Sequence, residues 1–312
     1  MQIGILTKVN FCGTICLLFN MRVPFGGRAT GGHNRHDRFI KMEGVIHMKK
    51  LALILVLVLA LGIFGTAFAE EQSTIDRILQ QGYITVGCSL SGMPIGGYDE
   101  DGNPCGYDVD FATKLAECLG VELQIVDCNG DTRIPMLTSG QVDCFFANCT
   151  GNLTRAQTID FSIPYLRCGV KMLTAADSPY HTIEDLNTPD AKVAVGRGTT
   201  NEQLVLTFAP DAQITYADAF TEQQLLLEQG RVDAVFEDST LVDYAAGNSD
   251  GRLVAQDKLY TSDPICIGAR KGDIEWVRYL DMFVSWQISS GWQSETYYKW
   301  WGTEPSGMQY LW

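Results

Sequence analysis

Two stretches of the chain, SGQVDCFFANCT (139–150) and QGRVDAVFEDST (229–240), share the pattern Gly-x-Val-Asp-x-x-Phe-x-Asn/Asp-x-Thr. In each, a glycine ends a helical pattern, an apolar run typical of a buried strand follows, and polar side chains come directly after it. Open α/β sheets bind ligands beyond the carboxyl ends of their strands, which is where Asn148, Thr150 and Asp238 stand. The repeat therefore predicts two α/β lobes with a cleft between them.

The segments around this repeat alternate between strand-like and helix-like patterns. Strands are expected at 83–88, 121–126, 142–147, 191–195, 213–217 and 232–236, and helices at 106–120, 131–140, 199–209 and 219–230. Such alternation favours an α/β architecture in which each lobe is a mainly parallel sheet flanked by helices. The tail from Gly272 is helical, and we expect its tryptophans to pack in the core rather than to form a ligand platform: Trp276, Trp286, Trp292, Trp300 and Trp301.

The segment MKKLALILVLVLALGIFGTAFA (48–69) joins two lysines, an apolar run and an Ala-Phe-Ala ending. These are the parts of a cleaved secretory signal peptide. A membrane anchor is the competing interpretation, but the apolar run only reaches the lower length limit for crossing a bilayer. No cysteine follows the run, which argues against a lipid anchor. We therefore expect a periplasmic protein, and we interpret residues 1–47 as an upstream extension translated from too early a start.

Charge and residue usage exclude several classes of function. Residues 1–69 hold 8 of the 23 basic and 2 of the 37 acidic residues, so the remaining 15 and 35 give a formal charge of −20. A chain this acidic is a poor partner for nucleic acid or an anionic membrane surface. His181 is the one histidine after residue 69, so we predict no metal, no cofactor and no catalytic residues. Eight cysteines remain in the same region and permit disulfides, although their spacing selects no pairing.

Further motifs are spread from Ile84 to Gly302: G-Y-D-V-D (106–110), R-I-P-M-L-x-S-G-x-V-D (133–143), T-x-x-x-x-R (150–155), D-F-S-x-P-Y (160–165), V-A-V-x-x-G-T-T (193–200), V-D-A-V-x-x-D (232–238) and K-W-W-G (299–302). Together they resemble the extracellular solute-binding proteins of polar amino-acid uptake systems, which include the periplasmic glutamine- and histidine-binding proteins. The resemblance implies a two-lobed periplasmic binding protein fold of type II. Lobe 1 would comprise 72–168 and 266–312, lobe 2 would comprise 169–265, and two strands would form the hinge.

The same resemblance implies an amino-acid site. Arg155 would clamp the ligand's α-carboxylate, because a guanidinium makes two parallel charge-assisted hydrogen bonds to a carboxylate. Thr150 would add its hydroxyl and backbone N–H. Thr199 and Thr200 would hold the same group at a helix N-terminus, where free N–H groups attract anions. Asp238 would bind the α-ammonium, and its competing role is that of N-cap for the next helix.

Side-chain recognition departs from the family pattern. Relatives commonly place aromatic or large apolar residues at two positions where this chain has Gly92 and Gly130. Without an aromatic platform there, Ser89, Ser91 and Met93 remain as candidates for contact with the ligand's side chain. We expect a pocket that does not depend on aromatic stacking and that favours a polar side chain.

The leading hypothesis is a monomeric binding protein that captures an amino acid by lobe closure and presents it to an ABC transporter permease in the inner membrane. Two alternatives stay open. One is an exported enzyme on the same fold, resembling the dehydratases that act on prephenate- or arogenate-like substrates, which would need a general acid or base over the substrate. The other is a ligand-sensing domain, which we expect to be followed by a membrane span.

Overall fold

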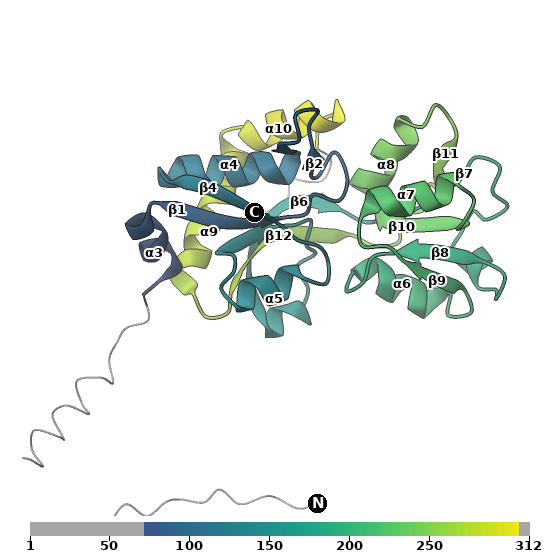
Figure 1. Ribbon diagram of the computed structural model, residues 1–312, viewed down its shortest axis with the longest axis horizontal. Helices are drawn as coiled ribbons and strands as arrows, with labels where there is room; N and C mark the ends of the chain where they lie inside the picture. Colours follow the sequence, from purple (N-terminus) through teal and green to yellow (C-terminus); the bar gives the residue numbers. More distant parts are fainter. Residues whose placement is uncertain (1–71, 306–312) are drawn as a thin grey trace, which may run out of the picture. The chain divides into compact units, whose positions relative to one another are not determined.

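The computed structural model describes residues 72–305, which form two five-stranded sheets flanked by helices (Figure 1). The predictions for residues 1–69 lie outside this range. The elements of the first sheet and its surroundings are α3 (Thr74–Gln81), β1 (Tyr83–Cys88), α4 (Tyr107–Leu119), β4 (Glu122–Asp127), α5 (Arg133–Thr138), β5 (Cys144–Phe146), β6 (Ile159–Cys168), β12 (Asp263–Arg270), α9 (Ile274–Ser289) and α10 (Trp292–Trp301). A small hairpin of β2 (Gly97–Tyr98) and β3 (Pro104–Cys105) precedes α4.

The elements of the second sheet follow β6 in the chain. They are β7 (Val170–Ala175), β8 (Lys192–Val195), α6 (Thr200–Phe208), β9 (Gln213–Tyr216), α7 (Phe220–Glu228), β10 (Ala234–Asp238), α8 (Ser239–Gly247) and β11 (Leu253–Ala255). Two short 3-10 helices lie at Arg155–Gln157 and Glu184–Leu186. Every strand and helix that the sequence predicts is present, with ends shifted by two residues or fewer.

The two sheets have the same construction. The first has the order β4-β1-β5-β12-β6, in which β1 runs parallel to β4 and β5 while β12 runs antiparallel to β5 and β6. The second has the order β11-β7-β10-β8-β9, in which β8 runs parallel to β9 and β10 while β7 runs antiparallel to β10 and β11. Both sheets are therefore mixed, and their parallel parts hold the strands expected from the sequence.

The chain passes between the sheets twice. Gly169 alone separates β6 from β7, and residues 256–262 connect β11 to β12. The passages lie side by side, because Cys168 pairs with Asp263 and the N–H of Val170 donates to Thr261 Oγ1 at 2.8 Å. These passages support the proposal that residues 169–265 form the second lobe and that two strands serve as its hinge.

Apolar side chains cover both faces of each sheet. In β5 the neighbouring residues Phe145 and Phe146 point to opposite faces, as strand geometry requires. Phe146 packs with Phe111 of α4 and Phe283 of α9, whereas Phe145 belongs to a cluster with Leu137 of α5. The first sheet is thus held between α4 with α9 on one face and α5 on the other.

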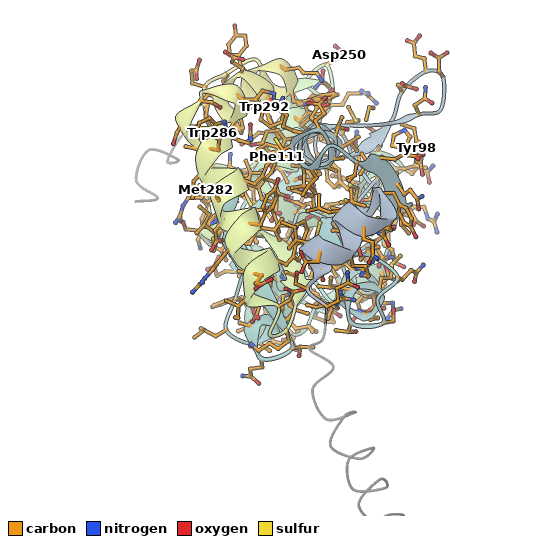
Figure 2. The ribbon with its side chains drawn as sticks, turned by 90° about the vertical axis from the view of Figure 1, so that its left-hand side faces the viewer. Tyr98, Phe111, Asp250, Met282, Trp286 and Trp292 are labelled. Atoms are coloured by element: carbon orange, nitrogen blue, oxygen red, sulfur yellow. The ribbon has the colours of Figure 1, made fainter. Side chains whose placement is uncertain are left out.

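The tryptophans of the C-terminal helices differ in burial. Trp276 is fully buried and donates its indole N–H to Asp143 O at 3.2 Å. Trp286 is 67% exposed and lies with Met282 on the outer face of α9 (Figure 2). The prediction of a core role is therefore wrong for Trp286. The buried stripe of α9 runs through 276, 280, 283, 284 and 287, and position 286 falls outside it.

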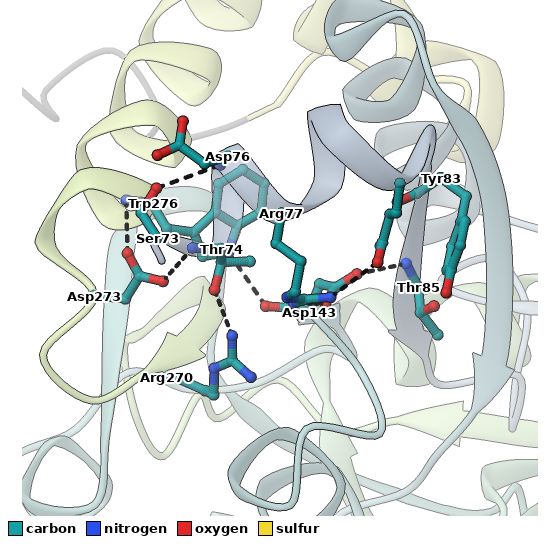
Figure 3. Close-up of polar contacts among 11 residues, drawn as sticks. Ser73, Thr74, Asp76, Arg77, Tyr83, Thr85, Asp143, Arg270, Asp273 and Trp276 are labelled. Atoms are coloured by element: carbon teal, nitrogen blue, oxygen red, sulfur yellow. Dashed lines mark hydrogen bonds and ion pairs between the residues drawn. The ribbon is translucent and has the colours of Figure 1, made fainter. Parts of the chain in front are cut away.

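A polar network fixes α3 to the first sheet (Figure 3). Asp143, which is 3% exposed, forms an ion pair with Arg77 and accepts a hydrogen bond from the N–H of Thr85 at 2.8 Å. The N–H of Thr74 donates to Asp273 Oδ2 at 2.9 Å, and Arg270 donates to Thr74 Oγ1 at 2.6 Å. The buried carboxylate of Asp143 thereby receives the charge-assisted partners that its burial requires.

The fold predicts one sharp packing effect at Gly268 of β12. A Cβ atom at this position would lie 2.1 Å from Cζ of the buried Phe145. We expect Gly268→Ala to lower the free energy of unfolding by about 1–3 kcal/mol, because the ring must move in a closely packed core. Urea unfolding measures this. Gly247→Ala, at a helical position with open space around it, is the control and should leave the midpoint unchanged or raise it. Equal midpoints for both variants would contradict this packing.

Candidate functional site

A cavity of about 60 Å³ lies between the carboxyl ends of the strands of the two sheets. Its walls come from the segments after β1, β4 and β5 on one side and from those after β8, β9 and β10 on the other. Seven of the nine residues proposed from the sequence line it: Ser89, Ser91, Asn148, Thr150, Thr199, Thr200 and Asp238. Both copies of the repeated pattern thus deliver their terminal polar residues to one place.

Arg155 and Met93 do not line the cavity. Arg155 donates from Nη1 to Thr150 O at 2.8 Å and from Nη2 to Gly198 O at 3.0 Å. It therefore joins the segment after β5 to the loop after β8, directly behind the cavity wall, and its burial lowers its pKa. Met93 Sδ instead accepts a weak hydrogen bond from Cys105 Sγ at 3.9 Å.

Asp238 makes a direct contact with the first sheet. Its Oδ2 accepts a hydrogen bond from Asn148 Nδ2 at 2.7 Å, and its side chain makes no capping bond to α8. Asn148 has a positive φ of 46°, a conformation that asparagine tolerates better than most residues. Its own N–H donates to Asp108 Oδ2 at 2.9 Å, and Tyr165 donates to Asp108 Oδ1 at 2.7 Å. A chain of hydrogen bonds therefore runs from the core of one sheet to the strand end of the other.

The acids of the site are held out of water, which disfavours their charged forms. Burial raises the pKa of Asp108 to about 7. Burial, together with the nearby charge of Asp263, raises the pKa of Asp238 to about 7. The pKa of Glu237, which accepts from Asn201 Nδ2 at 2.8 Å, is raised to about 8 by burial and by the charge of Asp238. Near neutral pH a large fraction of each of these carboxyl groups is therefore protonated.

The two threonines stand at the start of α6. Thr199 is its N-cap, since its Oγ1 accepts from the N–H of Glu202 at 3.1 Å and donates to Gly196 O at 2.8 Å. Thr200 is the first helical residue. On the opposite wall, the hydroxyls of Ser89 and Ser91 lie 2.9 Å apart. The walls thus present hydroxyl groups from both sheets.

The two glycines at the expected aromatic positions both line the cavity. A Cβ at Gly92 would lie 2.9 Å from Cδ1 of Phe220, and one at Gly130 would lie 2.7 Å from Arg197 O. The N–H of Thr221 also donates to Ser91 O at 3.0 Å. Phe220, at the start of α7, therefore occupies the space that a side chain at 92 would need. Phe220 thus brings an aromatic side chain to the cavity from the other sheet, and the expectation of a pocket that does not depend on aromatic stacking stays a prediction.

Sequence reasoning missed six further polar residues of the cavity wall: Arg133, Arg197, Asn201, Asp218, Gln223 and Glu237. Arg133 is 5% exposed and donates from Nη1 to Ala147 O at 2.7 Å. It belongs to the R-I-P-M-L motif, which was used only to detect a resemblance. The sequence did offer an indication of its role, because Arg133 is a charged residue on the inner side of a short apolar helix.

Comparison with known proteins identifies the family. Residues 84–303 match the model of the bacterial extracellular solute-binding proteins, family 3. The chain belongs to this family. It is 29% identical over 208 residues to the ABC transporter glutamine-binding protein GlnH of Bacillus subtilis (strain 168), covering 64% of this chain and 74% of that protein. It is also 29% identical over 178 residues to the cyclohexadienyl dehydratase of Pseudomonas aeruginosa, covering 56% of this chain and 66% of the enzyme.

Solved structures agree with the fold. The ancestral amino acid-binding protein AncCDT-1, a precursor of cyclohexadienyl dehydratase, superposes with a TM-score of 0.68 at 33% identity, covering 74% of this chain and 100% of that one. The predicted family and the two-lobed α/β fold are thereby confirmed, and the chain is a solute-binding protein by family. Within residues 72–305, no helix combines the length and apolarity needed to cross a membrane.

The pKa of Glu237 predicts a pH dependence of stability. Since that pKa is about 8 in the folded protein, against an ordinary 4.5, the folded state holds the proton more tightly than the unfolded chain. Protonation of Glu237 therefore stabilises the fold fully at pH values below the pKa in the unfolded chain. This stabilisation is lost as the pH rises through the pKa in the folded protein. We expect the melting temperature of the ligand-free protein to decrease as the pH is raised from about 5.5 to about 8.5. The variant Glu237→Gln should make the melting temperature depend less on pH.

A matched control separates this effect from general charge repulsion. Glu222 lies exposed in the first turn of α7, so Glu222→Gln removes the same charge without removing a buried acid. Melting curves of the three proteins across this pH range should show the flattened slope for Glu237→Gln alone. Parallel slopes for all three would contradict the buried-acid interpretation.

Proposed function

We propose that this solute-binding protein captures an amino acid between its two lobes and presents it to an ABC transporter permease. The observation that carries the proposal is the cavity itself, which is lined by both strand-end repeats and has Asp238 on one wall and Arg133 on the other. An amino acid has an ammonium group that complements the Asp238 wall and at least one carboxylate that complements a wall carrying a cation. The name of the relative GlnH, an ABC transporter glutamine-binding protein, supports the same role.

The ligand's two charged groups would replace contacts that now join the lobes. The α-ammonium would take the place of the Asn148 amide and would bind the buried carboxylate of Asp238. The α-carboxylate would draw the Arg155 guanidinium away from Gly198 O and would also meet the hydroxyl groups of Thr150 and Thr199. In each exchange an ion pair replaces a hydrogen bond in which at most one partner is charged, so the new interaction is the stronger one.

Capture requires the lobes to move. The volume of about 60 Å³ has room for a few water molecules and is too small for most amino acids. The walls meet at the contacts of Gly92 with Phe220, Gly130 with Arg197, and Asn148 with Asp238. Opening about the two chain passages near Gly169 and residues 256–262 would admit the ligand, and closure would exclude water and strengthen both ion pairs.

The cellular setting belongs to the same proposal. The apolar segment 48–69 would direct export, and the protein would work as a periplasmic monomer beside its permease in the inner membrane. Its strongly acidic surface suits a soluble carrier that does not adhere to anionic lipid. Intact-mass analysis of the exported protein would give the point of cleavage.

An enzymatic role is the second candidate, and one observation favours it. Two carboxyl groups of the cavity wall, those of Glu237 and Asp238, have pKa values of about 8 and about 7. A general acid works best when its pKa lies near the working pH, and one relative is a cyclohexadienyl dehydratase. Incubation with prephenate or arogenate, followed by spectroscopic detection of the aromatic product, decides between turnover and binding.

Calorimetry with a panel of the common amino acids tests the proposed binding. Asp238→Ala and Arg155→Ala should each weaken the binding of the selected ligand by about two to three orders of magnitude, because each leaves a buried charge without its partner, at a cost of about 3–5 kcal/mol. Melting curves should stay close to those of the native protein.

Asp101→Ala provides the matched control, since Asp101 is exposed, lies outside the cavity wall and makes no side-chain hydrogen bond among the described residues. Its ligand affinity should equal that of the native protein. If Asp238→Ala lost stability but kept its ligand affinity, Asp238 would serve the fold of the strand end alone, and the assignment of the ammonium to it would be wrong.

A further inference from the structure

Arg133 is a buried cation that makes no direct ion pair among the described residues. Its side chain is 5% exposed, and among residues 72–305 it makes no ion pair. Its Nη1 donates to two main-chain carbonyl groups, those of Ala147 at 2.7 Å and Asn148 at 3.4 Å. Its Nε is buried and has no hydrogen-bond partner. Two neutral acceptors therefore serve a group that has five N–H donors and a full positive charge.

Such an arrangement is costly in a folded protein. Buried charges are normally paired, and an unpaired one loses its hydration without compensation. The charge of Arg133 acts on three nearby acids and opposes the rise in pKa that their burial causes, but none of them contacts the guanidinium directly. Asp108 is bonded to Tyr165 and Asn148, Glu237 to Asn201, and Asp238 to Asn148. A direct partner for the guanidinium can reach it from outside the chain, through the cavity that Arg133 lines.

The distribution of charge along the cavity wall indicates where an anion belongs. All three acids that line it, Asp218, Glu237 and Asp238, come from the second sheet. The wall from the first sheet has no acid and carries Arg133 among hydroxyl groups and small residues. Arg197 also lines the second wall, but its guanidinium lies 3.9 Å from the centre of the Tyr216 ring, over which it stacks. The first wall is thus the positively charged end of the site.

We propose that Arg133 binds a second anionic group on the ligand, so that the protein selects amino acids with a carboxylate in the side chain. This inference rests on the proposed function, in which Arg155, Thr150 and the start of α6 already account for the α-carboxylate. The side-chain carboxylate is the remaining group with the charge that Arg133 lacks. A guanidinium accepts it in a bidentate manner, and the hydroxyls of Ser89 and Ser91 line the same wall.

The small residues of the first wall fit this assignment. Gly92, Gly130 and Ala147 add no long side chains to the first wall, in which Ile95 is the one large apolar residue. Phe220 lines the opposite wall and is 3% exposed. An ion pair formed in the cavity after lobe closure would be shielded from water, which makes the discrimination between a charged and a neutral side chain large.

Calorimetry with matched acids and amides tests the inference. The ligands are L-glutamate, L-aspartate, L-glutamine, L-asparagine and L-arginine, since each acid and its amide have nearly the same size and differ in charge. The native protein should bind one of the two acids about 10- to 100-fold more tightly than the corresponding amide, the range expected for a charge-assisted hydrogen bond. L-arginine should bind more weakly than that acid.

Arg133→Met and Arg133→Lys are the decisive variants. Met fills a similar apolar volume without charge, so Arg133→Met should reduce the ratio of acid to amide affinity to within about threefold while the amide affinity stays close to native. Arg133→Lys keeps the charge without the planar fork and should restore part of the ratio. Arg278→Met, on the exposed side of α9, is the control and should keep the native ratio.

The outcomes separate the two proposals. If no amino acid binds the native protein, the proposed function fails and this inference fails with it. If amino acids bind but an amide or L-arginine is preferred, or if Arg133→Met keeps the native ratio, the proposed function stands and the role of Arg133 is refuted. Should Arg133→Met fail to fold, the ratio measured on the native protein and on Arg133→Lys still decides, because a structural role predicts no preference for the acid.

Discussion

Ionisable groups that are held out of water need partners, and this requirement shapes the centre of the molecule. Arg133, Glu237 and Asp238 line a cavity of about 60 Å³, and the buried Asp108 accepts a hydrogen bond from the N–H of Asn148 in the same wall. Desolvation raises the pKa values of Asp108 and Asp238 to about 7 and that of Glu237 to about 8. The Nε of Arg133 is buried and has no hydrogen-bond partner. Under the proposed function an amino acid would bring the complementary groups, so its binding would relieve a cost that the folded protein otherwise bears.

The backbone around the site serves this arrangement. Asn148 takes a positive φ, which lets its N–H reach Asp108 while its amide reaches Asp238 across the cavity. Gly92 and Gly130 allow the walls to approach, since a Cβ on either would collide with Phe220 or with Arg197 O. The two walls are held together by apolar packing and by hydrogen bonds in which at most one partner is charged. A charged ligand can replace these hydrogen bonds with ion pairs.

Much of this could be predicted from the sequence, because the relevant signals are local. Glycines end α4 and the helical patterns before β5 and β10, and the repeat after them placed Asn148, Thr150 and Asp238 correctly at one cavity. The antiparallel strands β6, β7 and β12 were missed. Their partners lie far away in the chain, as with Asp263 and Cys168. The register of β12 with β6 also contains irregularities that break the alternation of apolar residues.

The site details that sequence reasoning missed depend on contacts between the sheets. Phe220 lines the cavity beside Gly92, but it comes from a helix more than a hundred residues further along the chain. The bonds of Arg155 to the carbonyls of Thr150 and Gly198 join segments of both sheets, and no local pattern indicates them. Arg133 carries a charge at a position where the pattern of α5 calls for a buried side chain, and its lack of a partner became visible only when the surrounding acids could be placed.

The most direct test of this account is a crystal structure of the protein with L-glutamate or L-aspartate bound. We predict that the ligand lies between the two sheets with its ammonium at Asp238 and its side-chain carboxylate within hydrogen-bonding distance of the Arg133 guanidinium. The Asn148 amide should then have left Asp238, and Arg155 should have left Gly198 O. A ligand bound elsewhere, or one that leaves Arg133 bonded only to the carbonyls of Ala147 and Asn148, would contradict the claim that the ligand supplies the missing charges.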